Sequence, residues 1–429
     1  MDLEKWIPGL QHREEMLAEL RMRSVEELFS DLPFTTELAL EPSKDEKLVK
    51  RDFLEKSQKN VPVLNFLGCG VYQIHVPALV NYLCQRSEFL TSYTPYQAEN
   101  SQGMLHALFE FQSLMAELTE MDVVNSSVYD GATALGEAAL MAKRINRKAE
   151  ILVPELYWEK RSVLVNYLQG SGMRIVEYPL TDGRIDLGEL SRLVSDETSC
   201  IYCELPNLLG LIDKNVYRLH ELGPLVIVGA NPLLLAAIEP PEADIAVGEG
   251  QILGLAPSFG GPLLGILGCK KEYVRQMPGR LVGMTHDLDG NRAFCLTLQT
   301  REQHIRREKA ISNLCTNEAL CALASTIYVE LLGAKGLRNL TEELMSKAKY
   351  LMEGINSLEG FTAPAFEGTY FNEFPVRSDF DWRTINSYLL KNGVQGGFVM
   401  ESGISLIAVS EEHTRKDLKI LIELLGRFR

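Results

Sequence analysis

The chain has 429 residues, of which 46% are hydrophobic and 24% charged, a composition typical of a globular protein with a well-buried core. Its formal net charge of −15 argues against nucleic acid or an anionic membrane surface as the main partner. No apolar run reaches the ~20 residues that span a bilayer, and no secretory signal opens the chain, so we expect a cytoplasmic protein without membrane contact.

Residues 1–60 are charged and carry short amphipathic periods. The periods cover Arg13–Leu20 and Val25–Phe29, and Lys44–Asn60 then places its charges at helical spacing. We predict a helical arm that packs on a larger body or on another subunit. A solvated helical cap is the alternative interpretation.

A polar, aromatic loop, Ser92–Asn100, precedes a helix that Ser101 is placed to cap. From Met104 onward the apolar residues of this helix repeat every three or four positions, which predicts a buried face. The loop is costly to bury without a ligand or partner, because it combines two tyrosines with several hydrogen-bonding side chains. The candidate ligand residues are Tyr93, Thr94, Tyr96, Gln97 and Glu99. A structural loop that packs its tyrosines at an interface is the alternative.

Asp130 is followed by Gly131, Ala132 and Thr133 at the start of a second helix rich in small residues. Free amides at a helix start attract anions, and glycine lets a ligand approach the backbone closely. Asp130 is a good N-cap but would repel a phosphate. An ordinary capped helix is therefore the favoured interpretation, and Gly131, Ala132 and Thr133 mark at most a vestigial phosphate loop.

From Val61 onward, short apolar runs alternate with helical patterns. Strands are expected at Ile151–Val153, Arg174–Tyr178, Ser199–Glu204, Leu225–Val228, Ala243–Val247 and Leu263–Leu267. Helices are expected between them at Trp158–Leu168, Leu187–Val194 and Val216–Glu221. This alternation, with strands that are apolar throughout, predicts a large, doubly wound, mainly parallel sheet.

The cysteines and histidines predict no metal site. Of eight cysteines, only Cys200 and Cys203 form a CxxC pair, and they lie in an expected buried strand. Residues three apart on a strand point to opposite faces, so this pair cannot chelate a metal. The seven histidines include no HxxxH or HExxH pair. We expect reduced core cysteines.

The sheet domain lacks the groups that hold a pyridoxal cofactor. An enzyme of the aspartate-aminotransferase fold needs an acidic residue for the pyridine nitrogen and a lysine for the Schiff base. After the strand Leu225–Val228 stands Asn231, which cannot stabilise a pyridinium as an aspartate can. No lysine occurs in Asn215–Cys269, and Lys270 and Lys271 are expected to face solvent. We therefore expect no covalently bound cofactor on this chain.

Basic residues crowd the stretch Leu298–Asn317, which is expected to be helical. They are Arg301, His304, Arg306, Arg307 and Lys309. In an acidic protein such a cluster suits a carboxylate, a phosphate or an acidic partner. The alternative is a helix whose basic residues pair with Glu302 and Glu308.

Two long helices, Leu320–Leu332 and Leu340–Leu358, are expected around Gly333 and Gly336 and lead to a second domain. Strands are predicted at Tyr370–Pro375 and Ile404–Val409, and helices at Trp382–Leu390 and Glu412–Leu425. The predicted organisation is a helical arm (1–60), a large domain (61–332) and a small carboxy-terminal α+β domain with its linking helix (333–429).

Several motifs together resemble one family. SYTPYQAENSQG, YDGATAL, SFGGP, RQMPGRLVG and LQTREQHIRREKAISNLCTN are similar to subunit 1 in the two-subunit form of glycine dehydrogenase (decarboxylating), the P-protein family of the glycine cleavage system. The motifs are long and follow in order from about Phe66 to Asn317. Two positions depart from the family pattern: Asn231 replaces an acidic residue, and Ala98–Glu99 replaces the more frequent Pro-Glu.

The resemblance implies a fold-type I pyridoxal-phosphate transferase architecture, with the lysine and the cofactor on subunit 2. It implies an active site between unlike subunits. There, glycine and the lipoyl H-protein give carbon dioxide and the aminomethyl-lipoyl H-protein, and the pyridoxal ring takes the electrons left by decarboxylation. The chain is then active only with the second subunit. A non-catalytic partner that only stabilises the cofactor subunit is the alternative function, and a stand-alone enzyme using Lys270 is disfavoured.

The resemblance also implies roles for particular residues. The loop Tyr93–Gln102 is expected to reach the partner's cofactor and glycine and to lend it Tyr93, Thr94, Tyr96, Gln97 and Glu99. The residues expected on the interface or substrate side are Ser101, Gln102, Arg301, His304 and Arg307.

Overall fold

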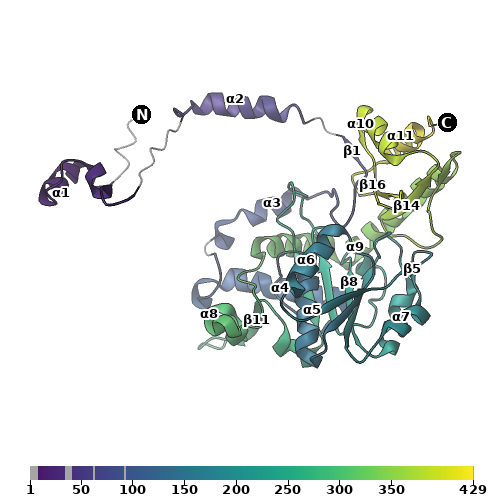
Figure 1. The fold of residues 1–429 in the computed structure, drawn as a ribbon, viewed down its shortest axis with the longest axis horizontal. Coiled ribbons are helices and arrows are strands. Elements are labelled where there is room, and N and C mark those ends of the chain that lie inside the picture. Colours follow the sequence, from purple (N-terminus) through teal and green to yellow (C-terminus); the bar gives the residue numbers. More distant parts are fainter. Residues whose placement is uncertain (1–7, 34–40, 61–62, 91–92, 429) are drawn as a thin grey trace. The chain divides into compact units, whose positions relative to one another are not determined.

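The computed structural model describes residues 8–33, 41–60, 63–90 and 93–428, and contacts divide the chain into two units, Met1–Val61 and Pro62–Arg429 (Figure 1). The three-domain division predicted from the sequence stays a prediction, and each unit is described by itself.

In the first unit, the predicted helices are confirmed. With η denoting a 3-10 helix, they are η2 (Leu10–His12), α1 (Arg13–Glu19), η3 (Val25–Phe29) and α2 (Glu46–Ser57). Asp45 starts α2, because its carboxylate accepts a hydrogen bond from the backbone N–H of Lys47 at 2.9 Å. None of these four helices contains a buried residue. Whether this unit packs on another body or is a solvated cap stays a prediction.

The second unit is built around a seven-stranded sheet, which confirms the predicted mainly parallel, doubly wound architecture. In spatial order its strands are β2 (Val123–Val124), β10 (Gly265–Cys269), β9 (Ile245–Glu249), β8 (Leu225–Ala230), β7 (Thr198–Leu205), β3 (Glu150–Val153) and β4 (Arg174–Glu177). The strands from β9 to β4 are parallel, whereas β10 runs antiparallel to β9 and β2. Every residue of β3, β7 and β10 is buried, as expected for strands covered on both faces.

Side chains of the strands alternate between two apolar cores. In β7, Ile201 and Cys203 join the core that α4 (Gln102–Thr119) and α9 (Ala319–Asn356) contribute to, whereas Cys200 joins the core of α5 (Gly131–Asn146) and α6 (Trp158–Leu168). The two cysteines therefore face opposite sides of the sheet, as their spacing predicts. Among the described residues, no group of three His, Cys, Asp or Glu side chains is placed to hold a metal ion.

Helices between the strands begin at capping residues. Asp130 accepts a hydrogen bond from Thr133 N at 2.7 Å and starts α5, and Asp186 starts α7 (Leu187–Leu193) in the same way. Ser101 stands at the N-cap position of α4, but its side chain makes no capping hydrogen bond. The remaining short elements are α3 (Ala78–Cys84), η4 (Ser87–Phe89), η5 (Ala98–Asn100), β5 (Leu180–Thr181), β6 (Arg184–Ile185), η6 (Lys214–Leu222), η7 (Leu234–Ala236) and η8 (Lys271–Gln276).

The stretch 298–317 is not the continuous helix expected from its sequence. Leu298 and Arg307 have positive φ angles of 51° and 52°, which a right-handed helix does not allow, and these break the stretch into short turns. The turns are η9 (Gln299–Arg301), α8 (Gln303–Arg306) and η10 (Arg307–Lys309). A hairpin that the sequence did not predict, β11 (Leu281–His286) with β12 (Arg292–Thr297), precedes them.

The helix α9 confirms the prediction of two helices around a glycine. Gly333 has a non-helical backbone inside α9, with φ 61° and ψ 175°, and divides it. Within the described ranges, α9 is the one helix long and apolar enough to cross a membrane, judged by length and composition only. Half of its most apolar window is buried in the fold, so this is weak evidence for a span.

The carboxy-terminal part contains a second sheet with its own apolar core. Its strands, in spatial order, are β13 (Phe361–Thr362), β14 (Glu373–Ser378), β17 (Ser405–Ala408) and β16 (Phe398–Val399). The predicted helices are present as α10 (Trp382–Lys391) and α11 (Arg415–Leu425), and β1 (Leu64–Asn65) pairs with β15 (Val394–Gln395). Phe66, Phe374 and Trp382 fill the core.

Candidate functional site

A cleft of about 290 Å³ lies at the carboxyl ends of β7, β8 and β9, between the start of α5, the first turns of α6, and Glu373 of β14. Open parallel sheets bind their ligands at this edge. Its polar lining includes Cys69, Tyr72, Lys160, Tyr202, Glu204, Glu249 and Glu373.

A carboxylate occupies the anion position at the start of α5. Glu249 Oε2 accepts a hydrogen bond from Gly131 N at 2.9 Å, and its Oε1 accepts from Gln251 N at 3.0 Å and Leu264 N at 2.9 Å. Burial raises the pKa of Glu249, and the three N–H donors oppose that rise. Gly131, Ala132 and Thr133 stand where the sequence placed a vestigial phosphate loop, but Glu249 and Asp130 already accept from Gly131 and Thr133.

Other polar groups of the cleft also partner one another. Lys160 Nζ pairs with Glu204, and the hydroxyl of Tyr202 donates to the same carboxylate at 2.9 Å. A Cβ at Gly229 would collide with the Tyr202 hydroxyl, so this tyrosine lies directly against β8. The side-chain oxygen of Asn231 accepts from Leu233 N at 3.0 Å and closes its own turn.

Glu373 closes the far wall of the cleft. Its carboxylate accepts hydrogen bonds from Cys69 N at 2.9 Å and from the Tyr72 hydroxyl at 3.0 Å. Burial raises the pKa of Glu373 to about 7, against the pull of these donors. The same burial raises the pKa values of Cys69 and Tyr72. The segment 69–72 is thereby joined to β14.

Lys270 lies at the opposite end of β9 from this cleft. Cys269 pairs with Ile245 at the start of β9, whereas Glu249 ends that strand beside Gly131. Lys270 is partly buried, which corrects its expected solvent-facing position, because its Nζ lies 2.9 Å from Asp244 Oδ1. Lys271 is exposed as expected. Neither lysine lines the cleft.

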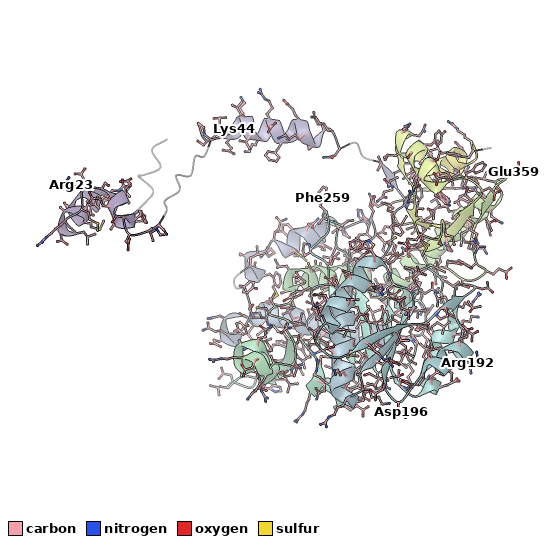
Figure 2. The ribbon with its side chains drawn as sticks, viewed as in Figure 1. Arg23, Lys44, Arg192, Asp196, Phe259 and Glu359 are labelled. Atoms are coloured by element: carbon pink, nitrogen blue, oxygen red, sulfur yellow. The ribbon has the colours of Figure 1, made fainter. Side chains whose placement is uncertain are left out.

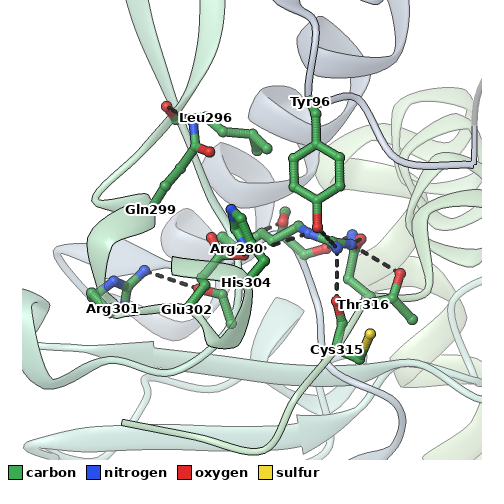
Figure 3. Close-up of polar contacts among 12 residues, drawn as sticks. Tyr96, Arg280, Leu296, Gln299, Arg301, Glu302, His304, Cys315 and Thr316 are labelled. Carbon is green, nitrogen blue, oxygen red and sulfur yellow. Dashed lines mark hydrogen bonds and ion pairs between the residues drawn. The ribbon is translucent and has the colours of Figure 1, made fainter. Parts of the chain in front are cut away.

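A second polar site forms around Tyr96 and Arg280 (Figure 3). The Arg280 guanidinium donates to the Tyr96 hydroxyl at 3.0 Å and lies 5.3 Å from the centre of its ring. The ring of His304 lies against Tyr96 at 5.1 Å between centroids. Glu302 is 3.9 Å from Arg280 Nε and 3.6 Å from His304 Nδ1. The structure thus brings together Tyr96 and His304, two residues predicted separately from distant stretches.

The other loop residues lie in different settings. Tyr93 is 82% exposed, and Gln97 and Glu99 are exposed. Thr94 is buried, and its hydroxyl has no hydrogen-bond partner among the described residues. Gln102 bonds the backbone of Phe294 through both ends of its amide, at 2.8 and 2.9 Å, and so fixes the loop to β12. Ser92 lies outside the described residues.

The basic cluster of the sequence does not act as one surface. Arg301 is buried and donates to the backbone oxygens of Leu298 at 3.1 Å and Gly279 at 2.9 Å, so it braces the fold. Arg307 is exposed, like Arg306 and Lys309. The ring of His304 contacts the ring of Tyr96. Ser101 is buried at the start of α4.

Sequence reasoning did not assign a role to Arg280, although it lies in the quoted motif RQMPGRLVG. The signal available in the sequence was an arginine between Gly279 and the apolar pair Leu281 and Val282, since an arginine drawn into an apolar setting is normally paired. Burial raises the pKa of Glu302, against the charges of Arg280 and His304. Four buried atoms near here have no hydrogen-bond partner in the described part of the chain: Thr94 Oγ1, Arg280 Nε, Arg301 Nη1 and Glu302 Oε1.

Apolar side chains are exposed beyond these sites. Figure 2 shows Phe259, in the loop after β9, pointing away from the fold. Tyr82, Leu90 and Leu288 are also large and exposed. Scattered exposed residues are common on monomers, so they alone define no interface.

Comparison with known structures first defines the class. The chain has the fold-type I architecture of pyridoxal-phosphate enzymes: a glutamate decarboxylase from Lactobacillus brevis matches it with a TM-score of 0.67 and 15% identity, covering 94% of this chain and 95% of that one. A glycine decarboxylase (P-protein) of the glycine cleavage system, in inhibitor-bound form, matches with a TM-score of 0.89 and 39% identity over 96% of this chain and 97% of that one.

Sequence comparison gives the family. The sequence-family model of the glycine cleavage system P-protein matches residues 5–425 of this chain, so the chain belongs to that family. It is 43% identical over 435 residues to the probable glycine dehydrogenase (decarboxylating) subunit 1 of Pyrococcus furiosus, covering 96% of each chain. It is 42% identical over 438 residues to the protein of the same name from Saccharolobus solfataricus, covering 97% of this chain and 96% of that one.

The cofactor of this fold class does not fit the cleft of this chain. Its phosphate would meet the Glu249 carboxylate at the start of α5, and Asn231 replaces the acidic partner of the ring nitrogen. The sequence has no lysine in the loop between β9 and β10. Lys160 does line the cleft, but its amine is paired with Glu204. The groups at these positions therefore do not match those that hold pyridoxal phosphate in this fold class.

Proposed function

We propose that this chain is the half of a two-subunit glycine decarboxylase that carries no cofactor. The partner, glycine dehydrogenase subunit 2, holds pyridoxal phosphate on its lysine. The two chains together decarboxylate glycine and pass the aminomethyl group to the lipoyl arm of H-protein. Support comes from the family and from the names of the relatives.

The observation that carries this proposal is a contrast between two sites. The polar groups of the cleft are already paired within the chain, whereas the loop around Tyr96 is exposed and fixed in position. Glu249 takes the anion position in the chain's own cleft, whereas Tyr96 stands 46% exposed on a loop held by Arg280. An exposed side chain fixed by a buried cation is already oriented for a ligand that this chain alone does not enclose.

We assign Tyr96 and His304 to the shared site, with Tyr93, Thr94, Gln97 and Glu99 around them. Gln102 holds the loop on β12, the backbone N–H of Ser101 donates to Ala98 O at 3.2 Å, and Arg301 braces the turn next to His304. Arg307 is exposed and is left as a partner contact. These side chains can orient and hydrogen-bond a small amino acid, and His304 can hold a proton near Tyr96.

A reconstitution experiment tests the proposal. The chain alone, titrated with pyridoxal phosphate, should give no aldimine absorbance band, and the mixture with subunit 2 should give that band and glycine-dependent exchange of carbon dioxide. A borohydride-trappable adduct on the lone chain would contradict the proposal and make Lys160, which lines the cleft, the first residue to mutate, followed by Lys270.

A second candidate function is a structural partner that contributes no side chain to catalysis. The deciding variants are Tyr96→Phe and Gln97→Ala, measured in the assembled complex. We expect reduced turnover with unchanged assembly. Tyr217→Phe is the matched control, because it also removes one hydrogen bond of a tyrosine hydroxyl, which Tyr217 donates to Glu239 O at 2.6 Å. Tyr217 lies in a different cleft, which Lys270 also lines. If both loop variants turn over like the control, the structural role is correct.

A further inference from the structure

Arg280 joins three segments that are far apart in the sequence. Its Nη1 donates to Thr316 Oγ1 at 2.9 Å and Asn317 Oδ1 at 3.0 Å, and its Nη2 donates to Cys315 O at 2.7 Å and the Tyr96 hydroxyl at 3.0 Å. Figure 3 shows Tyr96 pointing at this guanidinium from the loop.

The guanidinium itself has little freedom to move. Arg280 is 3% exposed, and its backbone oxygen accepts hydrogen bonds from the backbone N–H of Ser126 at 2.9 Å and from its hydroxyl at 3.0 Å. Because the guanidinium is planar and its donors are fixed in direction, the contacts to Cys315, Thr316 and Asn317 also set the direction of the bond to Tyr96.

That bond determines which way the tyrosine hydroxyl can act. A guanidinium only donates, so the Tyr96 oxygen is the acceptor and its hydrogen remains to be donated. No acceptor for that hydrogen is recorded within the described residues, and the side chain is half exposed. The ring of His304 covers part of its surroundings.

We infer that Arg280 is a positioning residue that presets Tyr96 as a hydrogen-bond donor to a carboxylate oxygen of the substrate. The inference rests on the proposed function, in which that substrate is glycine. An anionic oxygen makes the stronger bond to such a hydroxyl, and the positive charge behind the phenol favours an anion in front of it. Glu302, 3.9 Å from Arg280 Nε, offsets part of that charge.

The test is a double-mutant cycle in the complex of this chain with subunit 2 and H-protein. The variants are Tyr96→Phe, Arg280→Lys and the two together, and the readouts are KM for glycine and kcat. Removing a hydrogen bond to a charged oxygen should raise KM about tenfold. Arg280→Lys keeps the positive charge but loses the planar pair of N–H donors that directs Tyr96. KM for glycine should therefore rise by a similar factor, with a smaller change in kcat. The double variant should be no worse than Tyr96→Phe.

Hydrogen exchange on the isolated chain supplies a readout that does not depend on catalysis. Faster exchange of the backbone amides of 93–103 in Arg280→Lys, measured at a temperature well below the melting transition of both proteins, is the expected result. Should Arg280→Lys fail to fold, Thr316→Val removes one anchor of the guanidinium without changing charge and should raise KM in the same direction by a smaller factor.

Two results overturn the inference. One is an active complex in which the effects of Tyr96→Phe and Arg280→Lys multiply, since the residues would then act independently. The other is a KM that Arg280→Lys leaves unchanged. An inactive wild-type mixture contradicts the proposed function itself, and is thereby distinguished from both.

Discussion

The cleft at the ends of the strands and the loop around Tyr96 are both rich in polar side chains, yet they differ in how those side chains are satisfied. In the cleft, Glu249, Glu204 and Glu373 each accept at least two hydrogen bonds or ion pairs from the chain itself. Around Tyr96, several buried polar atoms lack a partner among the described residues. Buried polar groups are normally paired, so unpaired ones beside an exposed loop are consistent with a partner that this chain does not supply.

Glu249→Ala would break this comparison most strongly. It removes one buried carboxylate and leaves three backbone N–H groups without acceptors, so the free energy of unfolding should fall by about 4 kcal/mol. Denaturation in urea measures this. Phosphate should then raise the Tm of the variant more than that of the wild type, with chloride at equal ionic strength as the control. Equal phosphate responses would show that the helix start is not an anion site.

Glu373 gives the cleft a pH dependence. Its folded pKa is about 7 against an ordinary value of 4.5, so its contribution to stability is present below pH 4.5 and is lost as pH rises through 7. Over that window, the group should lower the free energy of unfolding by about 3 kcal/mol. Unfolding measured at several pH values should show a flatter slope in Glu373→Gln, and parallel slopes would contradict the assignment.

Lys160→Met separates stability from activity. The variant leaves Glu204 buried with only the Tyr202 hydroxyl, and the free energy of unfolding should fall by about 2 kcal/mol. Because the cleft is not used in catalysis under our proposal, turnover of the assembled complex should stay at the wild-type value. A large fall in turnover without a loss of assembly would show that the cleft has a ligand of its own.

Thr94→Val is the smallest change and sharpens the other side of the comparison. The valine replaces a buried hydroxyl that has no partner among the described residues, so the stability of the isolated chain should change by less than about 1 kcal/mol. Turnover with subunit 2 should nevertheless fall if the hydroxyl finds its partner in the complex. Unchanged turnover would remove Thr94 from the shared site.

The sheet could be predicted from the sequence because its strands are buried on both faces and therefore form unbroken apolar runs. The hairpin β11–β12 could not, because Met284, Thr285 and His286 in its first strand are exposed and give no clear pattern. The stretch 298–317 was misjudged because the positive φ angles of Leu298 and Arg307 leave no trace in residue type. Non-glycine residues adopt that conformation only where the surrounding structure imposes it.

The candidate site was predicted only in part, for a related reason. Tyr96 and His304 stood out by local composition, but Arg280 contacts Tyr96 across 184 positions of sequence, and no local pattern reports such a pairing. The absence of a lysine between β9 and β10 can be read directly from the sequence. The position of the Glu249 carboxylate at the start of α5 could not be read there, because a glutamate at a strand end draws no notice until its three N–H partners are seen.

The Glu249 carboxylate at the start of α5 also limits which substitutions could give this chain a cofactor during evolution. A lysine regained in the loop after β9 would still find an anion already bonded to Gly131 N. Loss of Glu249 before that lysine arose would lower the stability of the fold and bring no new chemistry. Neither mutation is useful without the other, and the order that avoids instability gives no advantage. Under the proposed function, one side chain and its three amide donors therefore keep this chain from acquiring the cofactor through a single substitution.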